Sequence, residues 1–292
     1  MGGLRYRHSV ALFLVPAVII YLTFFIYPFL HAFYSSFTNW NGFTTPDFIG
    51  LENYRSLMGS TVFRQSMGRI MIWVMSSITF KVGSALVIAY VLRKKMRGIR
   101  FFRAVVFIPF VISNAAMALM FAIAYDRHIG FINVFLRTIG LDSITRFWLA
   151  DMRTAFGAVI AIPIYQAIGY FFIILFGAMQ DVPEDLYEAG RIDGTNGLTE
   201  FFYVTLPGVW KTLSVCIIMA INGAFQNFDY IFILTYGGPN FSSEVPATYM
   251  YKALFVRSEY GYAGAAGMVI FVSVLLLTIF VRKVVATRYP TE

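Results

Sequence analysis

The stretch that decides the fold reads Tyr187-Glu188-Ala189-Gly190-Arg191-Ile192-Asp193-Gly194 and continues to Val204-Thr205-Leu206-Pro207. It is a polar segment near the centre of the chain, between two very apolar runs. Asp181 and Glu184 have the D-x-x-E spacing of a capping box, with Pro183 in the first turn, and predict the start of a short helix. Gly194 predicts its end, because glycine tolerates the left-handed conformation that follows many helices.

A second short helix is expected directly after the first. Asn196 and Thr199 are its predicted capping residues, and Pro207 is its predicted end. The segment over residues 180–207 is therefore expected to form two short helices joined by a sharp turn.

These residues also follow a gapped pattern, which reads E-A-A, three residues, G, nine residues, I, one residue, L-P. This chain has Glu188-Ala189-Gly190, then Gly194, then Val204, then Leu206-Pro207, so only Gly190 and Val204 depart from it, and both changes are conservative. The pattern resembles that of the membrane subunits of binding-protein-dependent ABC importers. The resemblance implies a type I importer permease fold and a cytoplasmic coupling loop at residues 180–207.

In that family the coupling loop lies in a cleft of a separate ATPase and passes the closing movement of the ATPase to the membrane helices. The resemblance assigns ATPase coupling to Glu184, Glu188, Ala189, Gly190, Asp193 and Gly194. It implies that Glu188 pairs with an arginine of the ATPase. The alternative is a solvated charge on a helix surface, worth less than about 1 kcal/mol.

Two further motifs narrow the resemblance. Phe48-Ile49-Gly50-Leu51-Glu52-Asn53-Tyr54 follows the first apolar run, and Leu234-Thr235-Tyr236-Gly237-Gly238-Pro239 follows the fifth. Both are typical of carbohydrate-type permeases and resemble the family of the larger maltose permease and the first glycerol-3-phosphate permease.

The composition indicates an all-α polytopic membrane protein. Of its 292 residues, 59% are hydrophobic and only 13% are charged. Several apolar runs reach the roughly 20 residues that cross a bilayer. We expect one transmembrane permease domain over residues 1–292, with six transmembrane helices at about Ala11–Phe33, Ile70–Leu92, Phe101–Tyr125, Thr154–Met179, Thr212–Thr235 and Ala263–Val281.

The basic residues predict the orientation. The connection between the second and third spans holds the densest basic run, Arg93, Lys94, Lys95, Arg97, Arg100 and Arg103, and such runs stay in the cytoplasm. Both termini, which carry Arg5, Arg7, Arg282 and Lys283, and the coupling loop then also face the cytoplasm. The net charge of +8 is accordingly interpreted as a topology signal and not as nucleic-acid binding.

Polar residues inside the spans are candidates for a substrate path, because they usually face a bundle interior or a watery path. Asn222, Gln226 and Asp229 have the spacing of one helix face, with Tyr230 beside them. The fourth span offers Tyr165, Gln166 and Tyr170. The alternatives are hydrogen bonds that hold the bundle together and ordinary aromatic packing.

Lys81 lies near the middle of the second predicted span. A charge there costs about 2.5–3.5 kcal/mol on insertion scales, so the side chain is expected to face protein, water or an anionic partner. It can attract an acidic group on the substrate, or it can be a structural partner of a carboxylate or a lysine that snorkels to the interface.

Catalytic and metal-binding patterns are missing from the sequence. It has no G-x-x-x-x-G-K-[ST] loop for nucleotide phosphates. The three histidines, His8, His31 and His128, have no metal-ligand spacing, and the lone cysteine, Cys216, lies in an apolar run. We therefore expect no cofactor in this chain, with ATP and Mg on a partner ATPase.

The sequence favours a permease subunit of an ATP-driven ABC importer for a sugar or oligosaccharide, neutral or acidic, in a bacterial or archaeal cytoplasmic membrane. The expected partners are a second homologous permease, two ABC ATPase subunits and an extracytoplasmic binding protein. The alternative of a different class is an ion-coupled secondary transporter, with Asp229 and Lys81 as coupling charges. That class often shows inverted repeats, and none is evident here. A membrane-embedded enzyme is disfavoured because no catalytic constellation is present.

Overall fold

A computed structural model describes residues 14–93 and 98–288 of the chain, and the side chains of 285–288 are outside the description. Within these residues the secondary structure is helical, apart from one isolated bridge between Thr38 and Phe48. The prediction of an all-α membrane protein is confirmed. The contacts divide the chain into two compact units, and the single-domain assignment over residues 1–292 stays a prediction.

The first unit combines the described residues 14–61 with residues 250–271. Its described helices are the stretch Leu14–Ser35, which includes η1 (Leu22–Ile26) and α2 (Tyr27–Ser35), then α3 (Glu52–Gly59), η5 (Lys252–Val256) and the first part of α16 (Tyr260–Arg288). Gly261 and Gly264 let α16 approach the backbone around α2 closely. A Cβ at Gly261 would lie 2.0 Å from the carbonyl oxygen of Thr38. The small residues at the start of α16 are therefore packing positions.

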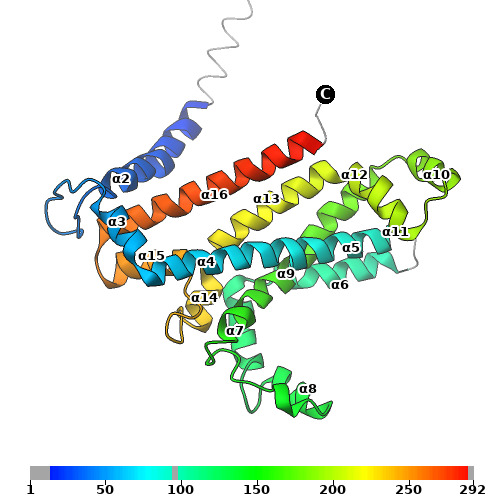
Figure 1. Cartoon of the computed structure of the whole chain (residues 1–292), viewed down its shortest axis with the longest axis horizontal. Helices are drawn as coiled ribbons and strands as arrows, with labels where there is room; N and C mark the ends of the chain where they lie inside the picture. Colours follow the sequence, from blue (N-terminus) through cyan, green and yellow to red (C-terminus); the bar gives the residue numbers. More distant parts are fainter. Residues whose placement is uncertain (1–13, 94–97, 289–292) are drawn as a thin grey trace, which may run out of the picture. The chain divides into compact units, whose positions relative to one another are not determined.

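The second unit combines the described residues of 62–249 with residues 272–288, and its helices are labelled in Figure 1. Its helices run in the order α4 (Thr61–Ser76), η2 (Ser77–Val82), α5 (Gly83–Leu92), α6 (Ile99–Val111), α7 (Asn114–Ala124), α8 (Phe131–Thr138), η3 (Asp142–Ile144), α9 (Ala155–Gln180), α10 (Glu184–Ile192), α11 (Gly197–Glu200), η4 (Phe201–Thr205), α12 (Leu206–Gly208), α13 (Trp210–Gln226) and α14 (Asp229–Leu234). The short α15 (Pro246–Tyr251) crosses the boundary between the units.

The described residues contain five helical stretches that are long and apolar enough to cross a membrane, Leu14–Ser35, Thr61–Leu92, Ala155–Gln180, Trp210–Leu234 and Tyr260–Val284. A sixth span is obtained if the bent pair α6 and α7 is counted as one. The predicted count of six spans agrees with this arrangement. The basic residues Arg5, Arg7, Lys94, Lys95 and Arg97 lie outside the described residues, so the orientation stays a prediction.

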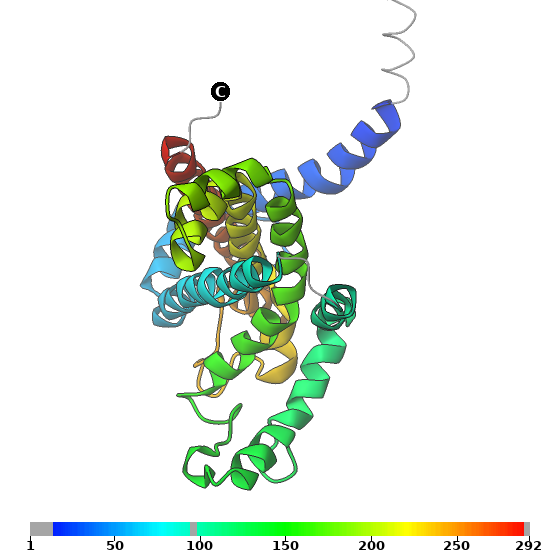
Figure 2. The ribbon, with the colours of Figure 1, turned by 90° about the vertical axis from the view of Figure 1, so that its right-hand side faces the viewer.

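The third span is broken, so the prediction of a single helix at about Phe101–Tyr125 is wrong. The axes of α6 and α7 meet at 93°, a turn that is visible in Figure 2. Pro109 lies in the last turn of α6, and Ser113 adopts an extended conformation and accepts a hydrogen bond from the Ala116 N–H at 3.3 Å. The N-cap therefore starts a new helix where the hydropathy continues unchanged, so hydropathy alone gave no sign of the break.

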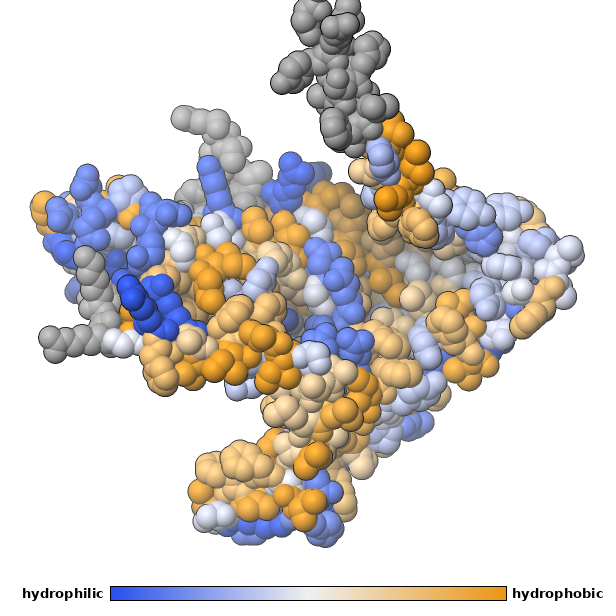
Figure 3. Space-filling model, turned by 180° about the vertical axis from the view of Figure 1, so that it is seen from behind, coloured by the Kyte–Doolittle hydropathy of each residue, from blue (hydrophilic) through white to orange (hydrophobic). Residues whose placement is uncertain are grey.

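The core of the second unit lies among α5, α9 and α13. The buried residues there include Ala85, Ala89, Phe172, Leu175 and Cys216, and Cys216 is a free thiol. The outer face of α6 is different, because Phe101, Ile108 and Val111 are 76%, 57% and 72% exposed. Figure 3 shows extensive hydrophobic surface of this kind, as expected for helices that contact lipid.

The two carbohydrate-type motifs hold loops in place. In the first, the Asn53 amide donates to the carbonyl oxygens of Ser36 and Thr38 at 2.9 and 2.8 Å. In the second, the Thr235 hydroxyl lies 2.8 Å from the Ser243 hydroxyl, which donates to the Gly238 carbonyl at 2.7 Å. Each motif thus closes the loop that follows a span.

Candidate functional site: the coupling segment and a polar cavity

The first short helix of the coupling segment is α10. It begins at Glu184, and its N-cap is Pro183, whose extended ψ of 134° turns the chain into the helix. The prediction that Asp181 caps this helix is wrong. Because α9 continues to Gln180, Asp181 is the C-cap residue of that helix, with helical φ and ψ, and an N-cap residue needs an extended conformation.

The predicted end of α10 is confirmed. Gly194 has a φ of +84°, and the Thr195 N–H donates to the Gly190 carbonyl at 2.9 Å across the turn. This left-handed position requires glycine, because a Cβ would be strained there. Gly194 therefore sets the angle between α10 and the next helix.

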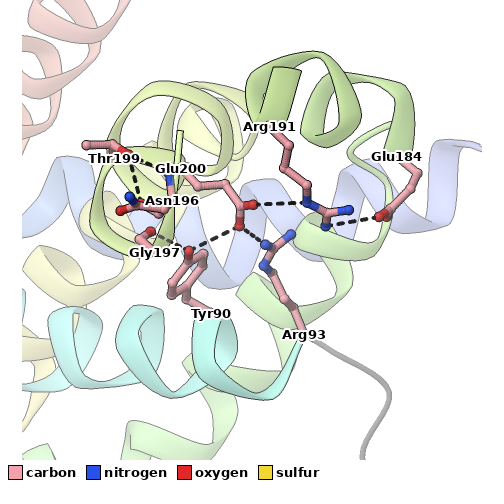
Figure 4. Close-up of polar contacts among 8 residues, drawn as sticks. All are labelled: Tyr90, Arg93, Glu184, Arg191, Asn196, Gly197, Thr199 and Glu200. Atoms are coloured by element: carbon pink, nitrogen blue, oxygen red, sulfur yellow. Dashed lines mark hydrogen bonds and ion pairs between the residues drawn. The ribbon is translucent and has the colours of Figure 1, made fainter. Parts of the chain in front are cut away.

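The second short helix starts as predicted and ends later. Asn196 is extended and is the N-cap of α11, and its N–H donates to the Thr199 hydroxyl at 2.8 Å (Figure 4). Pro207 does not close the helix, so that prediction is wrong. The helical path continues through η4 into α12, which contains Pro207 and ends at Gly208.

A buried carboxylate holds the segment against the end of the second span. Glu200 forms an ion pair with Arg93, and the two side chains are 7% and 8% exposed. The Tyr90 hydroxyl donates to the same carboxylate at 3.2 Å, and Arg191 lies 3.7 Å from it (Figure 4). The Arg93 guanidinium also stacks over the Tyr187 ring at 4.0 Å. Burial makes this cluster the electrostatic anchor of the coupling segment.

The predicted coupling residues fall into a buried group and an exposed group. Gly190 is buried, and a Cβ on it would lie 2.8 Å from the Thr195 hydroxyl and 3.1 Å from Val204. The two positions that depart from the family pattern, Gly190 and Val204, are thus neighbours in space. The exposed members are Glu184, Glu188, Ala189, Asp193 and Gly194.

The exposed side of the segment combines charge with large apolar side chains. Ile192 and Leu198 are 86% and 74% exposed, and Leu186 is 51% exposed. Glu188 is an exposed residue of α10 and forms no ion pair within the described residues. The Glu184 carboxylate, in contrast, lies 3.6 Å from the Arg191 guanidinium. Sequence reasoning had singled out the carboxylates and missed these apolar residues, although their presence in a polar segment was a usable signal.

A second feature is a cavity of about 340 Å³ among η2, α6, α9 and α13. It brings together Lys81, Gln166, Tyr170 and Tyr230, four of the residues predicted for a substrate path. Sequence reasoning missed several other lining residues, Phe110, Asn114, Phe171 and Asn227. Asn114 follows the break in the third span. Because the sequence did not predict this break, it did not indicate Asn114 as a lining residue.

Hydrogen bonds fix one wall of this cavity. The Tyr230 hydroxyl donates to the Gln166 side-chain oxygen, and the Gln166 amide donates to the Ile112 carbonyl at 2.7 Å. That carbonyl lies at the break in the third span, where the helix cannot use it. Gln166 therefore stabilises the bend between α6 and α7, and on the neighbouring wall the Tyr170 ring stacks on Phe110 with a centroid distance of 4.6 Å.

The remaining predicted residues do not line the cavity. One helix face was expected to carry Asn222, Gln226 and Asp229. The first two lie on α13 with the predicted spacing, but this helix ends at Gln226 and Asp229 begins α14, so the prediction is wrong for Asp229. Asn222 donates to the Ile218 carbonyl of its own helix at 3.0 Å, and Asp229 accepts from the Asn114 amide at 3.2 Å. Tyr165 is 51% exposed and is not among the residues that line this cavity. A role for these four in a substrate path stays a prediction.

Comparison with known proteins gives consistent relationships. A family model described as "Binding-protein-dependent transport system inner membrane component" matches residues 82–289. The probable ABC transporter permease protein YurN of Bacillus subtilis (strain 168) is 38% identical over 275 residues, which cover 93% of this chain and 94% of that protein. The multiple sugar-binding transport system permease protein MsmF of Streptococcus mutans serotype c is 32% identical over 276 residues, 93% of each chain.

The fold also matches a solved structure. A chain in the crystal structure of a bacterial ABC transporter involved in the import of the acidic polysaccharide alginate superposes with a TM-score of 0.85. The match covers 98% of both chains at 22% sequence identity. At this identity the likeness establishes the fold alone.

Proposed function

Because the chain belongs to the family of binding-protein-dependent transport system inner membrane components, it is a multi-pass permease subunit and not an enzyme, and we propose that it carries a sugar or oligosaccharide through an ATP-driven importer. Relatives named for sugar transport, such as MsmF, support the substrate class. The coupling segment, with its exposed face and buried anchor, is the observation that carries the proposal.

The exposed face of α10 and α11 docks in a cleft of an ATPase on the cytoplasmic side. Glu188 pairs there with an arginine of the ATPase, and Ile192 and Leu198 fill apolar pockets beside it. Their exposures of 86% and 74% support this, since large apolar side chains in a polar segment mark a protein interface. The Arg93–Glu200 pair then transmits the movement of the segment to the second span, because it connects α11 to the end of α5.

The polar cavity forms part of the path of the sugar. Its stacked aromatic pair offers a flat surface for a sugar ring, and its amides offer hydrogen-bonding groups. The volume of about 340 Å³ lies at the lower end of small-molecule sites, so it fits one sugar unit at a time.

The assembly that performs transport contains this chain, a second homologous permease, two ABC ATPases and an extracytoplasmic binding protein. ATP and Mg are held by the ATPases, and this chain supplies no cofactor. ATP binding closes the ATPases and moves the coupling segment, which opens the spans outward to accept substrate. Hydrolysis of ATP then resets them.

The test is purification of the tagged chain in mild detergent from its native cell, followed by transport in proteoliposomes. Co-purification of a second permease and a P-loop ATPase is expected. Glu188→Ala should abolish ATP-driven uptake, whereas Asp185→Ala, which removes an exposed carboxylate from the same helix, should change it little. Full uptake by Glu188→Ala would contradict the coupling role, and transport by a lone monomer driven by an ion gradient would contradict the importer itself.

A further inference from the structure

Lys81 is a buried cation in the middle of a membrane span. It belongs to the helical stretch Thr61–Leu92, and its side chain is 3% exposed. Among the described residues, no carboxylate lies within ion-pair distance of it, and its only aromatic contact is with the Phe171 ring, 5.9 Å from the Nζ atom. A structural ion pair within the described chain is therefore not the reason for this charge.

Snorkelling does not account for the charge either. A snorkelling lysine lies along an outer surface and holds its charged end in water, whereas Lys81 is 3% exposed. Lys81 is instead one of the residues that line the polar cavity. The charge thus lies inside a membrane span, where burying it costs the most free energy, and it borders a cavity that can hold a small molecule.

The backbone is irregular at this position. Residues Ser77–Val82 form a π-helical turn between α4 and α5, and this turn packs against both α9 and α13. Such turns are frequent at functional sites, because the extra residue redirects a side chain without ending the helix. The turn places Lys81 opposite the helices that contribute Gln166 and Tyr230.

The polar groups around Lys81 are already engaged with each other. The Tyr230 hydroxyl and the Gln166 amide form a chain of hydrogen bonds that ends at the Ile112 carbonyl. Asn114 is held between Tyr230, at 3.3 Å, and Asp229, at 3.2 Å. Among the described residues that line the cavity, Lys81 is therefore the charged one, and no carboxylate compensates its charge.

Resting on the proposed function, we propose that Lys81 determines substrate charge, and that the sugar carried by this permease bears an anionic group, a carboxylate or a phosphate. The anion pairs with the Lys81 ammonium while the sugar ring lies on the aromatic surface of Phe110 and Tyr170. A neutral sugar would leave the ammonium unpaired, so discrimination arises from the cost of an unsatisfied buried charge.

The first arm of the test identifies the charge of the substrate. The binding protein of the system is screened by thermal shift against matched pairs of probes, galactobiose with digalacturonate and maltose with maltose 6-phosphate. A shift with the carboxylate or the phosphate member of a pair is expected, and which member shifts separates the two anions. Binding and transport of only neutral members would overturn the proposal.

The second arm uses the assembled transporter in proteoliposomes with the anionic probe. Lys81→Met keeps the length of the side chain and removes the charge, and uptake should fall about ten- to a hundredfold, the range for a lost charged hydrogen bond. Lys81→Arg should retain uptake within a few fold, and Ser84→Ala, on the same helix and outside the cavity lining, is the matched control. Unchanged uptake by Lys81→Met would overturn the proposal.

A third measurement separates recognition from structure. Lys81→Met should leave the melting temperature of the purified complex unchanged or raise it, because it removes an unpaired buried charge. A clear fall in melting temperature, with equal loss of all transport, would mean a structural pair with the second permease and would overturn the proposal. ATP hydrolysis stimulated by the loaded binding protein tests the proposed function separately, since it should persist in every variant.

Discussion

Removal of the Glu200 carboxylate should release α11 from the end of α5. In Glu200→Ala the Arg93 guanidinium, 8% exposed, loses its anion. Breaking one side of a buried pair costs about 3–5 kcal/mol. Arg93 retains its stacking on Tyr187 and lines an open cavity of about 750 Å³ that water can enter, so we expect the lower end, about 3 kcal/mol.

Hydrogen exchange of the backbone over residues 196–208 in the assembled transporter measures this loss. A local destabilisation of about 3 kcal/mol accelerates exchange by roughly a hundredfold or more. The double variant Arg93→Met with Glu200→Met should recover most of the protection, because apolar residues of similar size often replace a buried pair at little cost. Glu184→Ala, which breaks an exposed pair with Arg191, should cost less than about 1 kcal/mol.

Two results would refute the reasoning about this anchor. The first is exchange in Glu200→Ala that remains close to the wild-type rate, which would mean that apolar packing alone holds α11. The second is a double variant that exchanges as fast as the single one, because the cost would then not come from an uncompensated buried charge.

Three further outcomes are expected elsewhere in the molecule. Gly190→Ala should destabilise the turn between α10 and α11 by about 1 kcal/mol, because the new Cβ lies 2.8 Å from the Thr195 hydroxyl, and addition of Thr195→Ala should restore melting of the complex toward wild type. Asn133→Ala should cost about 2–3 kcal/mol and expose the loop around α8 to protease, because the buried amide bonds three carbonyls and the Trp148 indole N–H; unchanged digestion would contradict this. Hydrogen bonds from the backbone N–H groups of His128 and Ile129 hold the pKa of Asp126 below its ordinary value. Their contribution to the stability of this loop is therefore fully present above the ordinary pKa and is lost as the pH falls through the lowered pKa. Hydrogen exchange of the backbone amides of residues 128–130, corrected for the intrinsic rate, should become faster in the wild type as the pH falls through this lowered pKa. In Asp126→Asn the corrected exchange rate should not depend on pH.

The sequence by itself determined the class of the protein and the place of the coupling segment. Long apolar runs and a shortage of charge dictate membrane helices, since the bilayer leaves the backbone few alternatives. Gly194 and Asn196 predicted the turn correctly, because the conformations that these residues favour depend on local geometry. Lys81 was singled out correctly as a charge that needs an explanation.

Only the tertiary structure decided what surrounds each of these residues. The bend at Ile112 is stabilised by a distant group, the Gln166 amide on the Ile112 carbonyl, and this contact could not be predicted from the local sequence. Glu200 drew no attention in the sequence, yet it is the buried anchor because Arg93 approaches it across 107 residues of chain. Local propensity and hydropathy determine elements, whereas pairing of buried polar groups depends on packing between elements far apart in the chain.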